Sequence, residues 1–197
     1  MSDRDIISLY DRLANEYDRE RGRALFEKKW LDRFLEHVPG AGTVLDLGCG
    51  MGEPIAQYIL SLGYRIVGCD SSPSLIALCR ARFPDEEWLV VDMRELALGR
   101  RFDGLIVWDS FFHLSMDDQR TMFVRFAGHA NPGAPLLFTS GPEAGESIGS
   151  YHGEPLYHAS LDPQEYRRLL GHCGFTVQAY EPDDADCGGH TVWLATF

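Results

Sequence analysis

Three glycines occupy every second position between residues 48 and 52, in the stretch VLDLGCGMGEP. Because glycine has no side chain, this spacing lets a ligand come close to the main chain. A second apolar run, YRIVGCD, ends at Asp70, eighteen residues after Gly52. A carboxylate in that place can accept hydrogen bonds from both hydroxyls of a ribose. The two features together predict a nucleoside-binding site.

The residue after the last glycine indicates which kind of nucleoside fits. The dinucleotide-binding pattern G-x-G-x-x-G needs a small residue at its sixth position, where a pyrophosphate approaches the start of a helix. That position is Glu53 in this chain. Its carboxylate would suit the positive end of a helix dipole but would repel a pyrophosphate. We therefore expect a ligand with a ribose and no phosphate, which disfavours NAD and FAD.

Apolar runs and amphipathic segments alternate along the chain, and this alternation predicts an α/β fold with a mostly parallel sheet. The expected strands are largely continuous apolar runs, as is typical of strands covered on both faces. They span residues 43–47, 65–69, 88–91, 102–108 and 135–139. Helices are expected over residues 53–61, 74–83, 117–130 and 163–173, followed by a closing hairpin with strands at 175–180 and 190–196.

Both the N-terminus and the segment after the fifth strand depart from this alternation. Helices are expected over residues 5–17 and 24–37, and Tyr10 and Tyr17 would lie on one face of the first. Residues 140–160 are rich in glycine and contain two prolines, so we expect a long loop or a broken insertion there. Long loops in compact domains are commonly functional.

Composition limits the partners that the protein can have. A chain of 197 residues is long enough for one domain with a sizeable core. Its net charge of -12 disfavours nucleic acid and anionic lipid as partners, and no apolar run is long enough to span a membrane. The five cysteines form no C-x-x-C pair, and we expect no secretory leader before them. We therefore expect a cytoplasmic protein with reduced thiols and no metal site.

The motifs occur in an order that is typical of one family. VLDLGCGMG is followed by GCDSSPSLI, VVDMREL, FDGLIVWDSFFHL and PGAPLLFTSGP. This series resembles the class I S-adenosylmethionine-dependent methyltransferases from Tyr10 to Phe197. The resemblance implies a single domain over residues 1–197 with a doubly wound, Rossmann-like sheet of seven strands, the last antiparallel, and helices on both faces. Residues 1–38 would form lid helices, and residues 140–160 an insertion on the substrate side.

The resemblance also implies how S-adenosylmethionine would be held. The glycine turn and Asp46 would lie beneath its methionine part, and Asp70 would bind the ribose hydroxyls. Ser71 would lie beside the adenine, which Asp92 and Met93 would also contact. Tyr17, with Arg21, would cover the carboxylate end from the lid. The expected cofactor-binding residues are Tyr17, Asp46, Gly48, Cys49, Gly50, Gly52, Asp70, Ser71, Asp92, Met93 and Asp109.

Methyl transfer is an in-line displacement in which positioning does most of the work. A general base is needed only if the acceptor must lose a proton. Asp109 and His113, after the fourth strand, and His158, in the insertion, are the predicted catalytic residues. His113 has an equal claim to a capping or packing role. For His158, an exposed loop residue is the favoured alternative. Further candidates are His152, Tyr157 and His190, the last expected mainly to cap its strand.

The predicted function is therefore methylation of a small molecule that enters over the carboxyl ends of the fourth and fifth strands. One alternative is a regulatory module that binds the cofactor without turnover. Another is a nicotinamide-dependent oxidoreductase, which would require tight dinucleotide binding despite Glu53. The acceptor, the methylated atom and the oligomeric state stay open.

Overall fold

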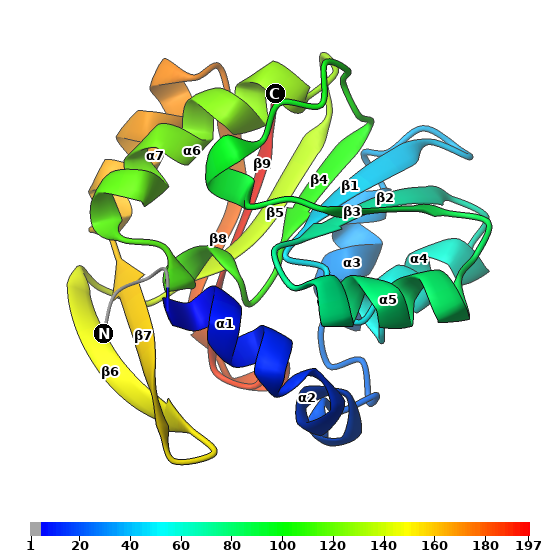
Figure 1. Ribbon diagram of the computed structural model, residues 1–197. Coiled ribbons are helices and arrows are strands. Elements are labelled where there is room, and N and C mark those ends of the chain that lie inside the picture. The colour runs from blue at the N-terminus through cyan, green and yellow to red at the C-terminus, as the bar shows by residue number, and fades with distance from the viewer. Residues whose placement is uncertain (1–4) are drawn as a thin grey trace.

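A seven-stranded sheet forms the centre of the protein in the computed structural model, which describes residues 5–197 (Figure 1). The strand order is β3-β2-β1-β4-β5-β9-β8. β1 to β5 run parallel, whereas β9 pairs antiparallel with both β5 and β8. The strands are β1 Thr43–Leu47, β2 Arg65–Asp70, β3 Glu87–Val90, β4 Gly104–Val107, β5 Pro135–Ser140, β8 Thr176–Asp184 and β9 His190–Thr196. The predicted doubly wound sheet with an antiparallel last strand is confirmed.

Helices cover both faces of this sheet (Figure 1). The helices on one face are α3 Lys28–Leu35, α4 Ile55–Ser61 and α5 Pro73–Arg82. The other face carries α6 Met116–His129 and α7 Pro163–His172. Each central strand sends alternate side chains to the two cores: Leu105 of β4 packs in the core under α6 and α7, and Ile106 in the core under α3 to α5. Burial on both faces explains why these strands read as continuous apolar runs.

The N-terminal helices are shorter than the sequence pattern predicts. The expected helix over residues 5–17 is two helices, α1 Asp5–Arg12 and α2 Ala14–Glu20, with Leu13 between them. Tyr10 and Tyr17 still meet, because their rings lie edge to face with centroids 5.4 Å apart. The helix expected from residue 53 begins at Ile55. Glu53 therefore precedes α4, and its carboxylate pairs with Arg23 instead of lying in the first helical turn.

Of the two alternatives expected over residues 140–160, the long loop is wrong for most of that range. β6 Gly145–Tyr151 and β7 Glu154–Ser160 form a separate two-stranded sheet, which stands apart from the main sheet in Figure 1. His152 and Gly153 connect the strands, and both have positive φ, 51° and 79°. Positive φ at both connecting residues is the geometry of a tight hairpin turn. The sequence carries no strand signal here, because most of β6 is exposed and its residues do not alternate between buried and exposed. The glycines of the segment are also typical of loops.

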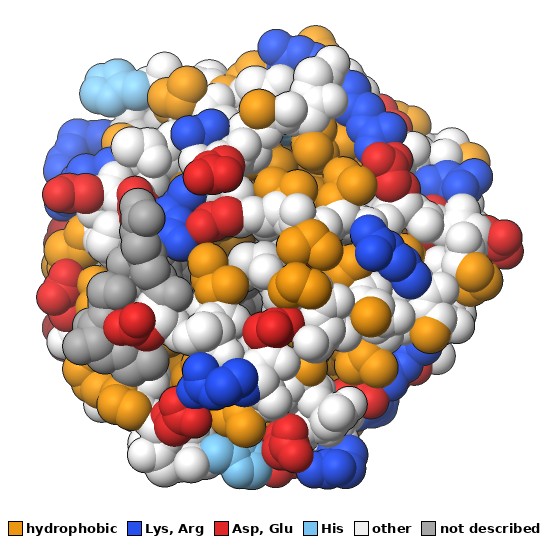
Figure 2. Space-filling view, in the orientation of Figure 1, with side chains coloured by type: hydrophobic (Ala, Val, Ile, Leu, Met, Phe, Trp, Pro, Cys, Tyr) orange, Lys and Arg blue, Asp and Glu red, His pale blue; other side chains and the backbone are white. Residues whose placement is uncertain are grey.

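The described surface carries charges of both signs. On the face that Figure 2 shows, acidic and basic side chains are interspersed among the described residues. Within residues 5–197, no helix is long and apolar enough to cross a membrane. All five cysteines are free thiols.

Two glycines with opposite surroundings test the packing between α3 and β4. A Cβ at Gly104 would lie 2.5 Å from Cζ of Phe34, whereas a Cβ at Gly128, near the end of α6, would meet nothing within 4 Å. We expect Gly104→Ala to lower the free energy of unfolding by about 1 to 3 kcal/mol through overpacking. Gly128→Ala should raise it by about 0.5 to 1 kcal/mol, because alanine favours helix. Urea unfolding measures both, and equal effects would contradict the described packing.

Candidate functional site

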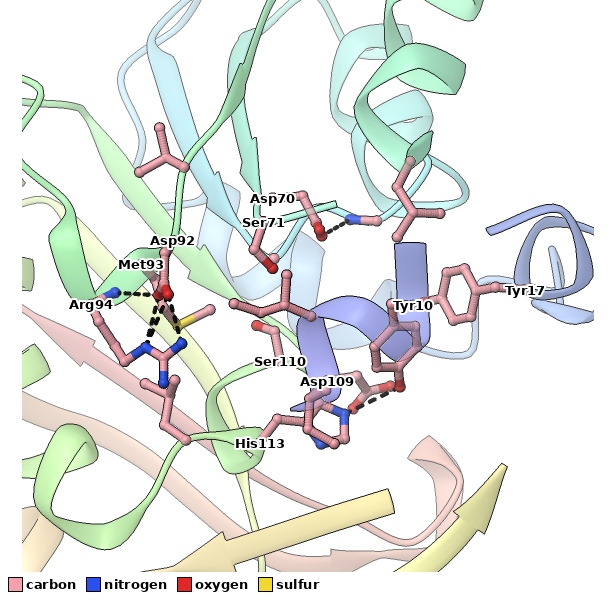
Figure 3. A pocket seen from close by; sticks show the side chains of 17 residues that line it. Tyr10, Tyr17, Asp70, Ser71, Asp92, Met93, Arg94, Asp109, Ser110 and His113 are labelled. Atoms are coloured by element: carbon pink, nitrogen blue, oxygen red, sulfur yellow. Dashed lines mark hydrogen bonds and ion pairs between the residues drawn. The ribbon is translucent and has the colours of Figure 1, made fainter. Parts of the chain in front are cut away.

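A pocket opens at the carboxyl ends of β1, β2 and β4, beneath helices α1 and α2 (Figure 3). Its walls come from both helices and from the segments that follow four parallel strands. We call it the main pocket. It is lined by Ile6, Ile7, Tyr10, Tyr17, Gly48, Gly50, Asp70, Ser71, Leu75, Val91, Asp92, Met93, Arg94, Asp109, Ser110, His113 and Leu114.

The glycine turn shapes the floor of this pocket. Gly48, Gly50 and Gly52 have φ values of 74°, 56° and 83°, a conformation that side chains rarely adopt. A Cβ at Gly48 would lie 2.2 Å from Cβ of Ser110, and one at Gly50 would lie 3.3 Å from the ring of Tyr17. The turn therefore needs glycine for its own backbone and for contact with neighbouring side chains. Close approach of a ligand at Gly48 and Gly50, which line the pocket, stays a prediction.

Asp70 connects the end of β2 to this turn. Its Oδ2 accepts a hydrogen bond from the backbone N–H of Gly50 at 3.0 Å, and its Oδ1 accepts one from that of Ser72 at 2.9 Å. Each carboxylate oxygen has a further lone pair with which to accept a ligand hydroxyl. Burial raises the pKa of Asp70 to about 6.

Asp92 lies at the opposite side of the main pocket, after β3. Its side chain caps the short 3-10 turn Met93–Glu95 by accepting a hydrogen bond from the backbone N–H of Arg94 at 3.0 Å. The Arg94 guanidinium also contacts this carboxylate, with Nη2 2.6 Å from Oδ2 (Figure 3). Sequence reasoning did not single out Arg94, although it stands within the quoted motif VVDMREL. The charge of Asp92 is thus largely matched within the protein.

A smaller pocket continues from the main pocket, with which it shares Tyr17, Gly48 and Asp109. We call it the side pocket. Its other lining residues are Arg21, Asp46, Cys49, Gly52, Glu53, Ile55 and Trp108. It therefore takes in the three predicted cofactor-binding residues that the main pocket leaves out, Asp46, Cys49 and Gly52.

The side pocket contains polar groups that are buried without full compensation. Burial raises the pKa of Asp46 to about 7, and the nearby charge of Asp70 adds to this. The indole N–H of Trp108 is buried and has no hydrogen-bond partner among the described residues. Arg21 donates to Glu27, and Glu53 forms ion pairs with Arg23 and, at 3.7 Å, with Arg82. The repulsion of a pyrophosphate expected from Glu53 is therefore offset by these arginines.

His113 lies deep in the main pocket and is bonded through both ring nitrogens. Its Nδ1 is 2.8 Å from the carbonyl oxygen of Tyr157, and its Nε2 is 3.2 Å from the hydroxyl of Tyr10. Because a carbonyl can only accept, Nδ1 carries the proton and Nε2 accepts from Tyr10. Burial lowers the pKa of His113 to about 4, so the ring is neutral at pH 7.

Asp109 has a partner that sequence reasoning assigned to another role. Nε2 of His190 is 2.9 Å from Oδ1 of Asp109, and Nδ1 of His190 is 2.6 Å from the carbonyl oxygen of Cys187. Both ring nitrogens face acceptors, so the imidazolium form is favoured. The hydrogen bond to Asp109 is the main cause of the raised pKa of His190. The pairing of β4 with β5 and of β5 with β9 brings these residues together, and no local sequence signal indicates it.

A third, wider hollow lies beyond these histidines. We call it the outer hollow; it is lined by Phe112, Ser140, Gly141, Pro142, Glu143, Ala144, Gly145, Glu146, Ser147, His158, Ala159, Ser160, Gly188, Gly189 and His190. It adjoins the main pocket, because the ring of His158, which lines the hollow, lies beside that of His113, which lines the main pocket, with centroids 4.8 Å apart. Of the three predicted catalytic residues, Asp109 and His113 therefore line the main pocket and His158 the outer hollow.

The remaining candidates have other partners. His152, at the tip of the hairpin, bonds to Glu20 of α2 at 2.9 Å and lines none of the three cavities described above. The Tyr157 hydroxyl donates to Glu146 at 2.9 Å. Among residues 5–197, no group of three or more His, Cys, Asp or Glu side chains is arranged to hold a metal ion.

Comparison with known proteins identifies similar domains. A family described as a methyltransferase domain matches residues 44–133. The chain is 31% identical over 130 residues to dTDP-3-amino-3,6-dideoxy-alpha-D-glucopyranose N,N-dimethyltransferase of Streptomyces fradiae, an alignment covering 65% of this chain and 50% of that protein. It is 31% identical over 105 residues to trans-aconitate 2-methyltransferase of Azoarcus sp. (strain BH72), covering 52% and 41% of the two chains. The chain thus spans half or less of the length of these relatives.

Among solved structures, the fold is similar to that of 1,6-didemethyltoxoflavin-N1-methyltransferase from Burkholderia thailandensis. The TM-score is 0.73, with 20% sequence identity, and the match covers 98% of this chain and 86% of the other. At this level of identity, the likeness shows a shared fold.

The pKa values of His113 and His190 should be shifted in opposite directions. We expect His113 to have a pKa of about 4 and to be neutral at higher pH. The pKa of His190 should lie above the ordinary value for histidine. Asp109→Asn should return the pKa of His190 toward about 6.5. Asparagine tolerates the left-handed backbone of Asp109, whose φ is 48°. Imidazole ¹⁵N NMR across pH measures these values, and an unchanged His190 titration in the variant would contradict the ion pair.

The same pair predicts how stability depends on pH. A histidine whose pKa is raised in the folded state contributes stability that is fully present below its unfolded pKa, about 6.5, and is lost as pH rises through the folded value. Asp109→Asn should therefore lower the melting temperature more at pH 6 than at pH 9.

Proposed function

Because the chain belongs to the class I S-adenosylmethionine-dependent methyltransferase family, we propose that it methylates a small-molecule acceptor with S-adenosylmethionine. The observation that carries this proposal is the junction of the main and side pockets at Gly48, Tyr17 and Asp109. Such a pair of pockets suits a ligand with a nucleoside at one end and an amino acid at the other.

The polar groups of the two pockets fit the two ends of this cofactor. In the main pocket, we propose that Asp70 accepts hydrogen bonds from the ribose hydroxyls, with the adenine between Ser71 and the Asp92–Met93 segment. In the side pocket, the orphaned indole N–H of Trp108 would be satisfied by a carboxylate oxygen, next to the guanidinium of Arg21. The raised pKa of Asp46 indicates that its ionised form lacks a counter-charge, which an ammonium group would supply.

The charges of the site also favour a cationic ligand over a diphosphate. Asp46 and Asp70 line the two pockets, whereas Asp109 already pairs with His190 and the side-pocket cation Arg21 already donates to Glu27. When bound, the cofactor supplies a methyl group attached to a positively charged sulfur. A dinucleotide would bring two negative charges to the same carboxylates, which argues against the nicotinamide alternative.

We propose that the protein contributes mainly by positioning and by proton transfer. Tyr17, over Gly50, would close the cofactor pocket against water. His190 would hold the Asp109 carboxylate in place through their 2.9 Å contact. His113 would hold the hydroxyl of Tyr10 through Nε2, the ring nitrogen that carries no proton. Asp109, His113 and His158 stay the proposed catalytic residues, with a general base required only for a protonated acceptor.

Charge and cysteine content also bear on the class of substrate and on the cellular location. The net charge of -12 disfavours nucleic acid as the substrate. We propose a cytoplasmic location because all five cysteines are free thiols. Cys49 and Cys79 both direct Sγ to the carbonyl oxygen of Gly50, and an oxidising compartment would threaten this pair.

Ligand binding tests the proposed cofactor directly. We expect calorimetry to detect binding of S-adenosylhomocysteine and not of NAD. Asp70→Asn should weaken the former about thirtyfold, because replacing two charge-assisted hydrogen bonds by neutral ones costs about 2 kcal/mol in total. Asp117→Asn, at a side chain that is 94% exposed on α6, is the matched control and should change nothing. Wild-type affinity in a folded Asp70→Asn protein would place the ribose elsewhere.

Proton release tests the role of Asp46. Since its pKa in the ligand-free protein is about 7, Asp46 is largely protonated below pH 7 and must ionise to pair with an ammonium group. Affinity for S-adenosylhomocysteine should therefore fall as pH drops from 8 to 6, with proton release near pH 6.5. Calorimetry in two buffers of different ionisation enthalpy measures this release, which Asp46→Asn should abolish. Equal heats in both buffers would contradict the pairing.

A further inference from the structure

The outer hollow carries a net negative charge. Glu143 and Glu146 line it, and no Lys or Arg occurs among the described residues of its lining. The one lining group that favours a positive charge is His190, and that charge is matched by Asp109 at 2.9 Å. A hollow lined by charge of one sign concentrates ligands of the opposite sign. Cations are therefore attracted to this cavity, and carboxylate or phosphate groups are repelled.

The outer hollow also lies next to the place where the reaction would occur. Phe112 and His158 line it, and their rings lie 4.9 and 4.8 Å, between centroids, from that of His113, a residue of the main pocket. Phe112 and His158 face each other with centroids 5.3 Å apart. An aromatic surface beside carboxylates is a suitable surface for an alkylammonium group, which is attracted by both.

We propose that the outer hollow binds the methyl acceptor as a small protonated amine, attracted by Glu143 and Glu146, and that His158 accepts the proton that the amine must lose. This inference rests on the proposed methyl transfer and names the substrate class for it. The two glutamates act as specificity-determining residues, because they select cationic acceptors over anionic ones.

The bonding of His158 suits it to the proton transfer. Nδ1 of His158 is 3.2 Å from the carbonyl oxygen of Leu156, so Nδ1 carries the proton and Nε2 presents its lone pair. Burial lowers the pKa of His158, which keeps the ring neutral at pH 7. The N–H bond of the ammonium breaks and an N–H bond forms at Nε2. The positive charge passes to the imidazole, and the amine nitrogen gains the lone pair that a methyl acceptor needs.

Three probes of one size and different charge test the inference. Benzylamine, benzyl alcohol and benzoate are titrated into protein saturated with S-adenosylhomocysteine, and NMR shifts of the outer-hollow residues report binding. We expect benzylamine to bind at least about tenfold more tightly than benzoate at low salt, with a smaller preference at high salt. The double variant Glu143→Gln, Glu146→Gln should reduce the preference to about threefold or less. The amide oxygen introduced by Glu146→Gln can still accept from the Tyr157 hydroxyl, so the hairpin is preserved.

The control variant is Glu36→Gln, an exposed glutamate at the end of α3, which should leave the preference unchanged. Benzoate binding as tightly as benzylamine, a preference that survives in the double variant, or no shift at the outer hollow with any probe would each overturn the inference. Failure of the protein to bind S-adenosylhomocysteine in the first step would instead overturn the proposed function.

Discussion

A hydrogen bond from the backbone N–H of Gly50 to the Asp70 carboxylate, 3.0 Å long, joins the turn after β1 to the end of the adjacent strand β2. Parallel strands end at the same edge of a sheet, so this bond fixes the turn at the place where a doubly wound fold binds its ligands. It requires the left-handed backbone of Gly50, with φ of 56°. The same turn supplies the floor of the main pocket and part of the side pocket, and Tyr17 of α2 lies against it.

The fold buries two carboxyl groups near that turn, where their ionised forms lose contact with water. Asp46 and Asp70 have pKa values raised to about 7 and 6 by burial. A carboxyl whose pKa is raised in the folded state destabilises the protein as pH rises from its unfolded value, about 4, through the folded one. Without a ligand, stability is therefore lost at neutral pH in order to keep two carboxylates in the pockets. Sites that sacrifice stability in this way are commonly functional, because a bound counter-charge restores what burial removed.

Much of the fold could be predicted from the sequence, because β1, β2, β4 and β5 are largely apolar runs buried on both faces. The hairpin at residues 145–160 could not be predicted, because its strand β6 is exposed and its glycines are typical of a loop. Within the site, the glycine turn and Asp70 gave a signal through their spacing along the chain. The contact between Asp109 and His190 depends on the antiparallel pairing of β9 with β5, and the sequence has no local pattern for such a distant contact.

The most direct test of this account is a crystal structure of the protein with S-adenosylhomocysteine. The account predicts electron density for the ribose at Asp70, the adenine beside Asp92 and the amino-acid end in the side pocket near Arg21 and Trp108. Density for the ligand elsewhere on the chain would contradict it. So would crystals grown with a dinucleotide, if they showed a diphosphate bound at the glycine turn.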